Sequence, residues 1–273
     1  MFEVTLRDGA HVTGQSWGSG PGLVLVQRSL SVRADYAALG VALGDRYTLH
    51  VYDRRGHGDS TPRGSYLSLR QEVADLEAVL EETGSRAVLA HSSGALVALE
   101  LARRRDLDGL ALYDPGISLD GSLPYDWVPE LLAAIKRRDE ARAMAVVSRG
   151  FGRPAWMAPL PMWLRLALVR VFLRSRRGRM YRAQLDTGTS ELLQVIAHDR
   201  GPETYAGIRA PLWLAVGADS PGHYLATAEL LHRAVPGSRL EVVKGSRHSQ
   251  QGVPPALLAS LKGFLDECLT SVD

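Results

Sequence analysis

The chain has 273 residues, a length typical of one α/β core that carries an insertion. Its formal net charge is +2, from 32 basic and 30 acidic residues that are interspersed, so charge gives no reason to expect nucleic-acid binding. The single cysteine, Cys268, excludes an intramolecular disulfide and a cysteine-based metal cluster. With neither a signal-peptide pattern nor an apolar run of about 18 residues, we expect a cytoplasmic protein.

Apolar runs along the chain predict a mostly parallel sheet with helices between its strands. The first two strands flank Asp8-Gly9, a dipeptide that favours a hairpin turn, so the sheet is expected to begin with an antiparallel pair. Later strands alternate with helices, which predicts right-handed βαβ crossovers. The expected strands are 2–6, 11–17, 23–26, 47–52, 87–90, 109–113, 210–216 and 240–243, and the expected helices are 35–43, 69–82, 95–105, 224–235 and 255–269.

Between residues 117 and 202 the periodicity is almost wholly helical. We therefore predict an inserted helical cap, or lid, at 117–202 on a core formed by residues 1–116 and 203–273. A cap over the strand ends would form a pocket and exclude water from it, with Trp127, Trp156 and Trp163 as candidate substrate contacts. The expected cap helices are 128–138, 140–148, 162–174, 178–186 and 190–198.

Residues 160–182 combine apolar side chains with seven arginines, a pattern that also occurs in helices lying on membrane surfaces. The apolar stretch is short, however. A cap helix needs an apolar underside and a solvated top in any case, so a membrane partner is not expected.

The strongest signal lies in residues 86–102. A short apolar run, Ala87 to Ala90, is followed after Gly94 by strong helix formers, so a sharp strand-to-helix turn falls on His91-Ser92-Ser93. The turn reads A-x-S-x-G, and it resembles the nucleophile elbow of the α/β-hydrolase superfamily. With Tyr52-Asp-Arg-Arg-Gly56, the chain is most similar to a group of bacterial hydrolases that share this pentapeptide. The resemblance covers nearly the whole chain and implies the α/β-hydrolase fold.

The resemblance assigns an oxyanion hole to two backbone N–H groups, those of Ser93 and Ser29. Most relatives carry His-Gly where this chain has Gln27-Arg28. If that loop needs a positive φ at residue 28, arginine costs on the order of 1 kcal/mol, and the loop is expected to shift. Arg28 would also turn a positive charge toward the site entrance and favour an anionic substrate.

In this fold the nucleophile, the acid and the histidine follow one another in that order along the chain. Ser92 is the expected nucleophile, and His248, just after the last strand, is the expected base. Asp219 is the preferred acid, although it comes two residues after Gly217 where the common spacing is three. Asp114, after strand 109–113, is the alternative, unless it is only a turn residue ahead of Pro115.

These residues favour hydrolysis of an ester, thioester or lactone of a small organic substrate through an acyl-enzyme, with no cofactor or metal. A second hypothesis stays open, because Ala90 and Gln27-Arg28 both alter the surroundings of the oxyanion hole. A cofactor-free lyase, cyclase or isomerase could use the same fold. The sequence predicts no oligomeric state.

Overall fold

An eight-stranded sheet forms the centre of the computed structural model, which describes residues 1–64, 68–152, 154–157, 159–248 and 252–269. The strand order is β1-β2-β4-β3-β5-β6-β7-β8. The β1–β2 and β2–β4 pairs are antiparallel and the other neighbouring pairs are parallel, which confirms the predicted α/β-hydrolase architecture. The strands are β1 (Phe2–Thr5), β2 (His11–Trp17), β3 (Gly22–Val26), β4 (Thr48–Tyr52), β5 (Ala87–His91), β6 (Gly109–Tyr113), β7 (Leu212–Gly217) and β8 (Arg239–Val243).

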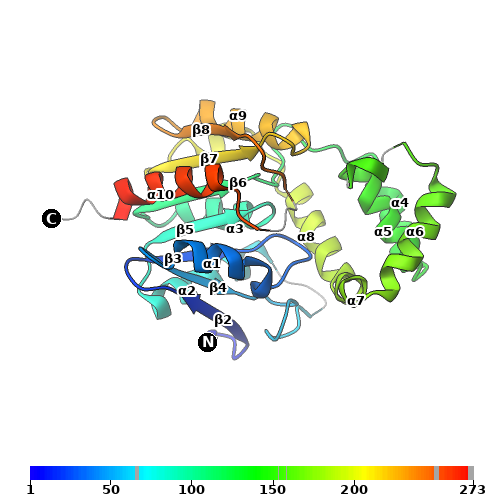
Figure 1. Cartoon of the computed structure of the whole chain (residues 1–273), viewed down its shortest axis with the longest axis horizontal. Helices are drawn as coiled ribbons and strands as arrows, with labels where there is room; N and C mark the ends of the chain where they lie inside the picture. Colours follow the sequence, from blue (N-terminus) through cyan, green and yellow to red (C-terminus); the bar gives the residue numbers. More distant parts are fainter. Residues whose placement is uncertain (65–67, 153, 158, 249–251, 270–273) are drawn as a thin grey trace.

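Helices cover both faces of the sheet (Figure 1). One face carries α2 (Leu69–Thr83), α3 (Gly94–Ala102) and α9 (Gly222–Ala234), and the other carries α1 (Ala37–Leu43) and α10 (Pro255–Leu269). Successive side chains of a strand point to opposite faces of the sheet. Val24 therefore packs in the core under α2, α3 and α9, and Leu23 and Leu25 pack in the core under α1 and α10. This two-sided burial explains why the central strands are continuous apolar runs.

Five helices lie between β6 and β7: α4 (Val128–Lys136), α5 (Glu140–Gly150), α6 (Met162–Arg174), α7 (Arg176–Ala183) and α8 (Leu185–Ala197). The first four stand to one side of the sheet, and α8 leads the chain back to it (Figure 1). They share a buried cluster of their own that includes Trp127, Leu131 and Met144. Helix α7 begins two residues earlier than expected because the Ser175 hydroxyl caps it, accepting the Gly178 N–H at 2.9 Å.

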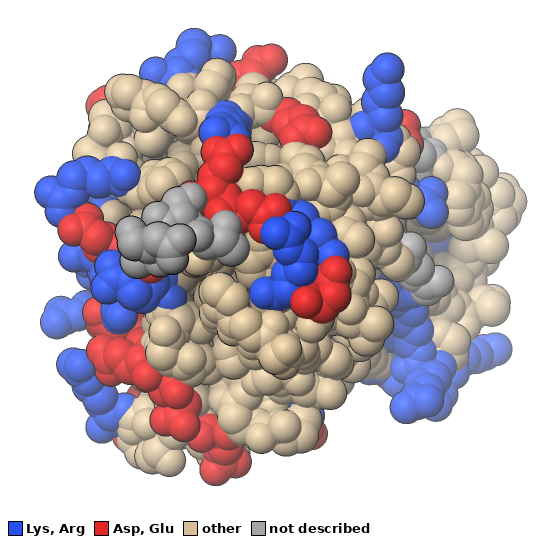
Figure 2. Space-filling view, turned by 60° about the vertical axis from the view of Figure 1, so that its left-hand side comes forward, with Lys and Arg blue, Asp and Glu red and all other residues tan. Residues whose placement is uncertain are grey.

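The surface carries both signs of charge. On the face in Figure 2, basic and acidic side chains are interspersed rather than gathered into a field of one sign, as the net charge of +2 suggests. Among the residues described, no helix is both long and apolar enough to cross a bilayer.

A buried carboxylate, that of Glu191 on α8, joins the helical segment to the core. Its Oε1 lies 3.1 Å from Arg54 Nη1 and 2.9 Å from His57 Nε2, while Oε2 accepts the Ser29 hydroxyl. Arg54 in turn contacts Glu72 of α2. Burial alone would raise the pKa of Glu191, but Arg54 and then His57 hold it below the usual glutamate range. The Tyr-Asp-Arg-Arg-Gly loop therefore acts as a scaffold that receives α8.

Replacing this carboxylate tests the link. Glu191→Gln leaves the buried Arg54 and Arg63 to share the carboxylate of Glu72 and removes the carboxylate partner of His57, so we expect the free energy of unfolding to fall by about 3 kcal/mol at neutral pH. Because the folded-state pKa is lowered, the stabilisation is present above the ordinary glutamate pKa and fades as pH falls below about 5. Urea denaturation of wild type and variant across acidic and neutral pH measures both effects.

The matched control is Glu229→Gln on the exposed side of α9, which should change stability by less than about 0.5 kcal/mol. Equal unfolding midpoints for Glu191→Gln and wild type at neutral pH would refute the structural role of the network.

Candidate active site

Ser92 occupies the turn between β5 and α3 with φ of 56°, a backbone conformation that costs a non-glycine residue about 1 kcal/mol. Two glycines make room for it. A Cβ on Gly94 would lie 2.5 Å from the Val26 carbonyl oxygen, and one on Gly116 would lie 2.8 Å from Ser92 Oγ. The final glycine of A-x-S-x-G is thus required by the close crossing of β3 and the elbow.

The two expected oxyanion donors differ in their surroundings. The Ser93 N–H, just before the first residue of α3, has no hydrogen-bond acceptor in the part of the chain that the structure describes. By contrast, the Ser29 N–H donates to Ser93 Oγ at 3.0 Å, and the two hydroxyls are 2.9 Å apart. The first donor is open to a ligand and the second is engaged within the protein.

In the loop after β3, the residue with a positive φ is not Arg28, the position considered from the sequence. Leu30, and not Arg28, has a positive φ, of 57°. The side chain of Leu30 packs on α8, where a Cβ on Gly188 would lie 2.8 Å from Leu30 Cδ2. Arg28 therefore needs no glycine-like backbone, and its N–H donates to the Tyr36 hydroxyl at 3.1 Å.

The structure brings Asp114, and not the preferred Asp219, to His248. Asp114 is fully buried, and its Oδ2 lies 3.2 Å from His248 Nδ1. Its Oδ1 accepts the Gly217 N–H at 3.0 Å, and Oδ2 also accepts the Ser220 hydroxyl at 2.7 Å. Asp219 is exposed. Asp219 was preferred on spacing, but the third residue after Gly217 is Ser220, whose hydroxyl donates to Asp114.

The other ring nitrogen of His248 contacts a residue that sequence reasoning missed. Nε2 is 3.1 Å from the Tyr224 hydroxyl, and the two rings stack with centroids 4.3 Å apart. Tyr224 lies in α9, where an aromatic residue looks like ordinary core, so the sequence carried no signal for it. Within the described ranges the Ser92 hydroxyl has no hydrogen-bond partner, and His248 Nε2 contacts the Tyr224 hydroxyl rather than Ser92.

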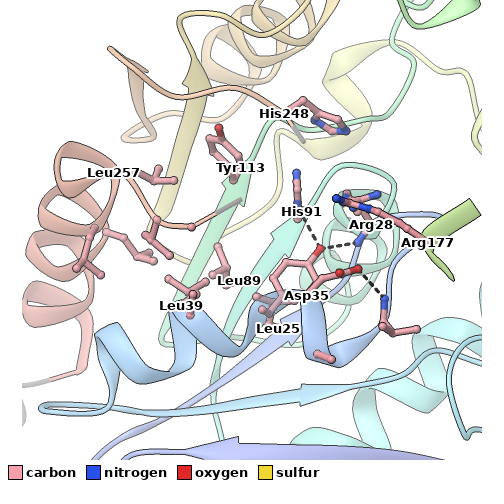
Figure 3. Close-up of a pocket in the computed structure, with 18 of the residues that line it drawn as sticks. Leu25, Arg28, Asp35, Leu39, Leu89, His91, Tyr113, Arg177, His248 and Leu257 are labelled. Carbon is pink, nitrogen blue, oxygen red and sulfur yellow. Dashed lines mark hydrogen bonds between the residues drawn. The ribbon is translucent and has the colours of Figure 1, made fainter. Parts of the chain in front are cut away.

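The three tryptophans named as candidate substrate contacts do not line the cavity beside His248. Trp127 packs inside the helical segment against Phe151, with ring centroids 5.0 Å apart. Trp156 and Trp163 are 63% and 70% exposed. Of the predicted substrate contacts, Arg28 alone lines the cavity of about 790 Å³ that opens beside His91 and His248 (Figure 3).

Among the described residues, one group has the donors for a metal ion: His91, Asp114 and His248, whose candidate ligand atoms lie within 4.8 Å of one another. Several of these atoms are already engaged. His91 Nδ1 lies 3.0 Å from the Tyr36 hydroxyl, and Asp114 accepts the bonds given above. The arrangement of Asp114 and His248 suits a base held by a carboxylate, which requires no metal.

Comparison with known proteins identifies the class that this fold and site define. The chain belongs to the alpha/beta hydrolase family, whose model matches residues 7–261. It is similar to an alpha/beta hydrolase from Sphaerobacter thermophilus, with 28% identity, a TM-score of 0.80, and coverage of 97% of this chain and 100% of that one.

Two relatives carry functional names. The RutD protein of Cronobacter turicensis, whose name links it to carbamate hydrolysis, is 27% identical over 81% of each chain. Lipase LipV of Mycobacterium tuberculosis is 35% identical, but over 36% of this chain and 39% of its own length.

One prediction concerns His91, whose ring lies 4.9 Å from that of His248. Burial, followed by the charges of His248 and Arg28, holds the pKa of His91 well below the usual imidazole range. We therefore expect its ring signals in ¹⁵N-resolved NMR to stay those of a neutral imidazole as pH falls through about 6, where ordinary histidines titrate. His91→Asn assigns the signal, and titration of His91 near pH 6.5 would contradict the burial described here.

Proposed function

We propose that this protein is a serine hydrolase that cleaves a carboxylic ester, thioester or lactone of a small organic substrate through an acyl-enzyme. Ser92 is the nucleophile, His248 the general base and Asp114 the group that orients the imidazole. The observations that carry the proposal are the strained elbow, with Ser92 at φ of 56° two residues before α3, and the pairing of His248 with the buried Asp114. A hydroxyl needs such a base because it is a weak nucleophile at neutral pH.

In the proposed reaction, Ser92 Oγ attacks the carbonyl carbon while His248 Nε2 takes the hydroxyl proton. His248 must first release the Tyr224 hydroxyl, since Nε2 is the nitrogen that Tyr224 contacts. The developing oxyanion accepts the open Ser93 N–H. The Ser29 N–H adds a second bond once it exchanges Ser93 Oγ for the substrate oxygen. Asp114 stabilises the imidazolium, the leaving group takes its proton, and water then cleaves the acyl-enzyme.

The helical segment at 117–202 is, in this proposal, a lid that excludes water from the acyl-enzyme. Its support is the contact between α8 and the loop after β3, where Glu191 accepts the Ser29 hydroxyl and Gly188 receives Leu30. The name of lipase LipV fits ester cleavage and that of RutD fits attack on a related carbonyl group.

A fluorophosphonate probe tests the nucleophile. We expect stoichiometric labelling of the wild type, located on Ser92 by peptide mass spectrometry, because the probe reacts with serines activated by a base. Ser92→Ala should lose the label and hydrolysis of p-nitrophenyl esters, and the exposed Ser19→Ala should keep both. Labelling of Ser92→Ala at the wild-type rate would refute the assignment.

Amide variants distinguish the roles of the Asp114 and Asp219 carboxylates. Asp114→Asn keeps the shape but cannot stabilise the imidazolium, so kcat should fall by about 10⁴. Asp219→Asn, at an exposed position, should change kcat by no more than about twofold. Ester hydrolysis by the two folded variants decides the matter, and a larger loss for Asp219→Asn would restore Asp219 as the acid.

A non-hydrolytic, cofactor-free reaction is the second candidate. Two contacts favour it: the Ser29 N–H is occupied by Ser93 Oγ, and His248 Nε2 is occupied by Tyr224. If the folded wild type resists the probe while binding carbonyl compounds, these contacts persist in solution and a lyase, cyclase or isomerase becomes the better proposal.

A further inference from the structure

The cavity of about 790 Å³ lies between the sheet and the helices α1 and α10 rather than at the Ser92 hydroxyl. Protein interiors are close-packed, and a space of this size falls in the range of small-molecule sites. Two small, exposed residues, Ala34 and Ala38, form part of its lining. Its apolar lining includes Leu25, Leu39, Leu89, Trp213, Leu257 and Leu261.

The two ends of the cavity differ in character (Figure 3). Leu257 and Leu39 lie at one end, whereas His91, His248 and the guanidinium groups of Arg28 and Arg177 lie toward the other. Arg176 is a further lining residue. Three guanidinium groups thus line the cavity.

The acidic residue Asp35 also lines the cavity, but its carboxylate accepts the Val32 N–H at 3.2 Å at the start of a short 3-10 helix, Arg33–Tyr36. The arginines therefore outnumber the acid, and the polar end favours an anion.

The His91 ring lies at this end of the cavity. The Tyr36 hydroxyl accepts the Arg28 N–H, which leaves its own proton for His91 Nδ1, so the ring proton of His91 belongs on Nε2. That N–H is buried and faces the His248 backbone, so it contributes no contact to a ligand in the cavity.

We propose that this cavity binds a long-chain carboxylate, that is, a fatty acid. Its carboxylate lies at Arg28, Arg176 and Arg177, and its alkyl chain extends between α1 and α10 toward Leu257 and Trp213. A small anion would leave the apolar end empty, and a neutral hydrocarbon would leave the exposed Arg176 and Arg177 without an anionic ligand, whereas Arg28 Nη1 already donates to the Ser29 and Leu30 carbonyl oxygens. Ser92 does not line the cavity, but His248, the proposed base, does, so the fatty acid would lie next to a residue of the proposed active site. The binding itself requires no reaction at Ser92.

Trp213 provides the readout, since it lines the cavity and is 2% exposed. A dibromostearate quenches only the tryptophans that its bromines approach. Below its critical micelle concentration we expect saturable quenching in the wild type and equally in Ser92→Ala, and loss of that component in Trp213→Phe. Absence of saturable Trp213 quenching in the wild type would overturn the proposal.

Charge and volume variants test the two ends separately. The double variant Arg176→Glu/Arg177→Glu should weaken binding at least about tenfold, while Arg179→Glu on the same helix, exposed and outside the cavity lining, should change it by less than about twofold. Ala38→Phe adds volume at the cavity lining without a change of charge or a new tryptophan, and it should weaken binding. The arginine variants decide the matter if Ala38→Phe does not fold.

A cationic amphiphile, dodecyltrimethylammonium, is the ligand control and should not displace the bromolipid. Displacement by it with the affinity of laurate, or unchanged binding in the double variant, would show a non-specific apolar crevice and refute the assigned polar end. Since Ser92→Ala is included, loss of hydrolysis and loss of binding are read independently.

Discussion

The buried carboxylate of Glu191 is the contact on which the site depends. An isolated carboxylate in a protein interior costs several kcal/mol, so Glu191 can occupy its position only because Arg54, His57 and the Ser29 hydroxyl receive it. Ser29 in turn contacts Ser93, the residue after Ser92. One ionised group thereby fixes α8 and the loop after β3 relative to the elbow.

Backbone strain gathers at the same edge of the sheet. Leu30, Ser92 and Asp114 have positive φ and follow the carboxyl ends of β3, β5 and β6, which are neighbours. Ligands of parallel sheets bind at this edge, and strained residues persist where the surrounding packing over-determines them. Packing and hydrogen bonds offset much of this strain. Leu30 packs against Gly188, and Asp114 accepts the Gly217 N–H.

The sequence predicted what short-range patterns determine: the strands, the elbow at Ser92 and the mostly parallel sheet. It could not decide between Asp114 and Asp219, because the answer depends on how the ends of β6 and β7 lie relative to His248. Glu191 and Tyr224 had no local signal, since each meets its partners across the fold. The tryptophans were misplaced because helical periodicity does not say which side of a helix faces the core.

The central claim is that a substrate carbonyl binds between Ser92 and the Ser93 N–H once His248 leaves Tyr224. A crystal structure of the protein inhibited by diethyl p-nitrophenyl phosphate tests it most directly. We predict phosphorus bonded to Ser92 Oγ, a phosphoryl oxygen accepting the Ser93 N–H, and His248 Nε2 detached from the Tyr224 hydroxyl. An adduct on another residue, or a phosphoryl oxygen turned away from Ser93, would contradict the account.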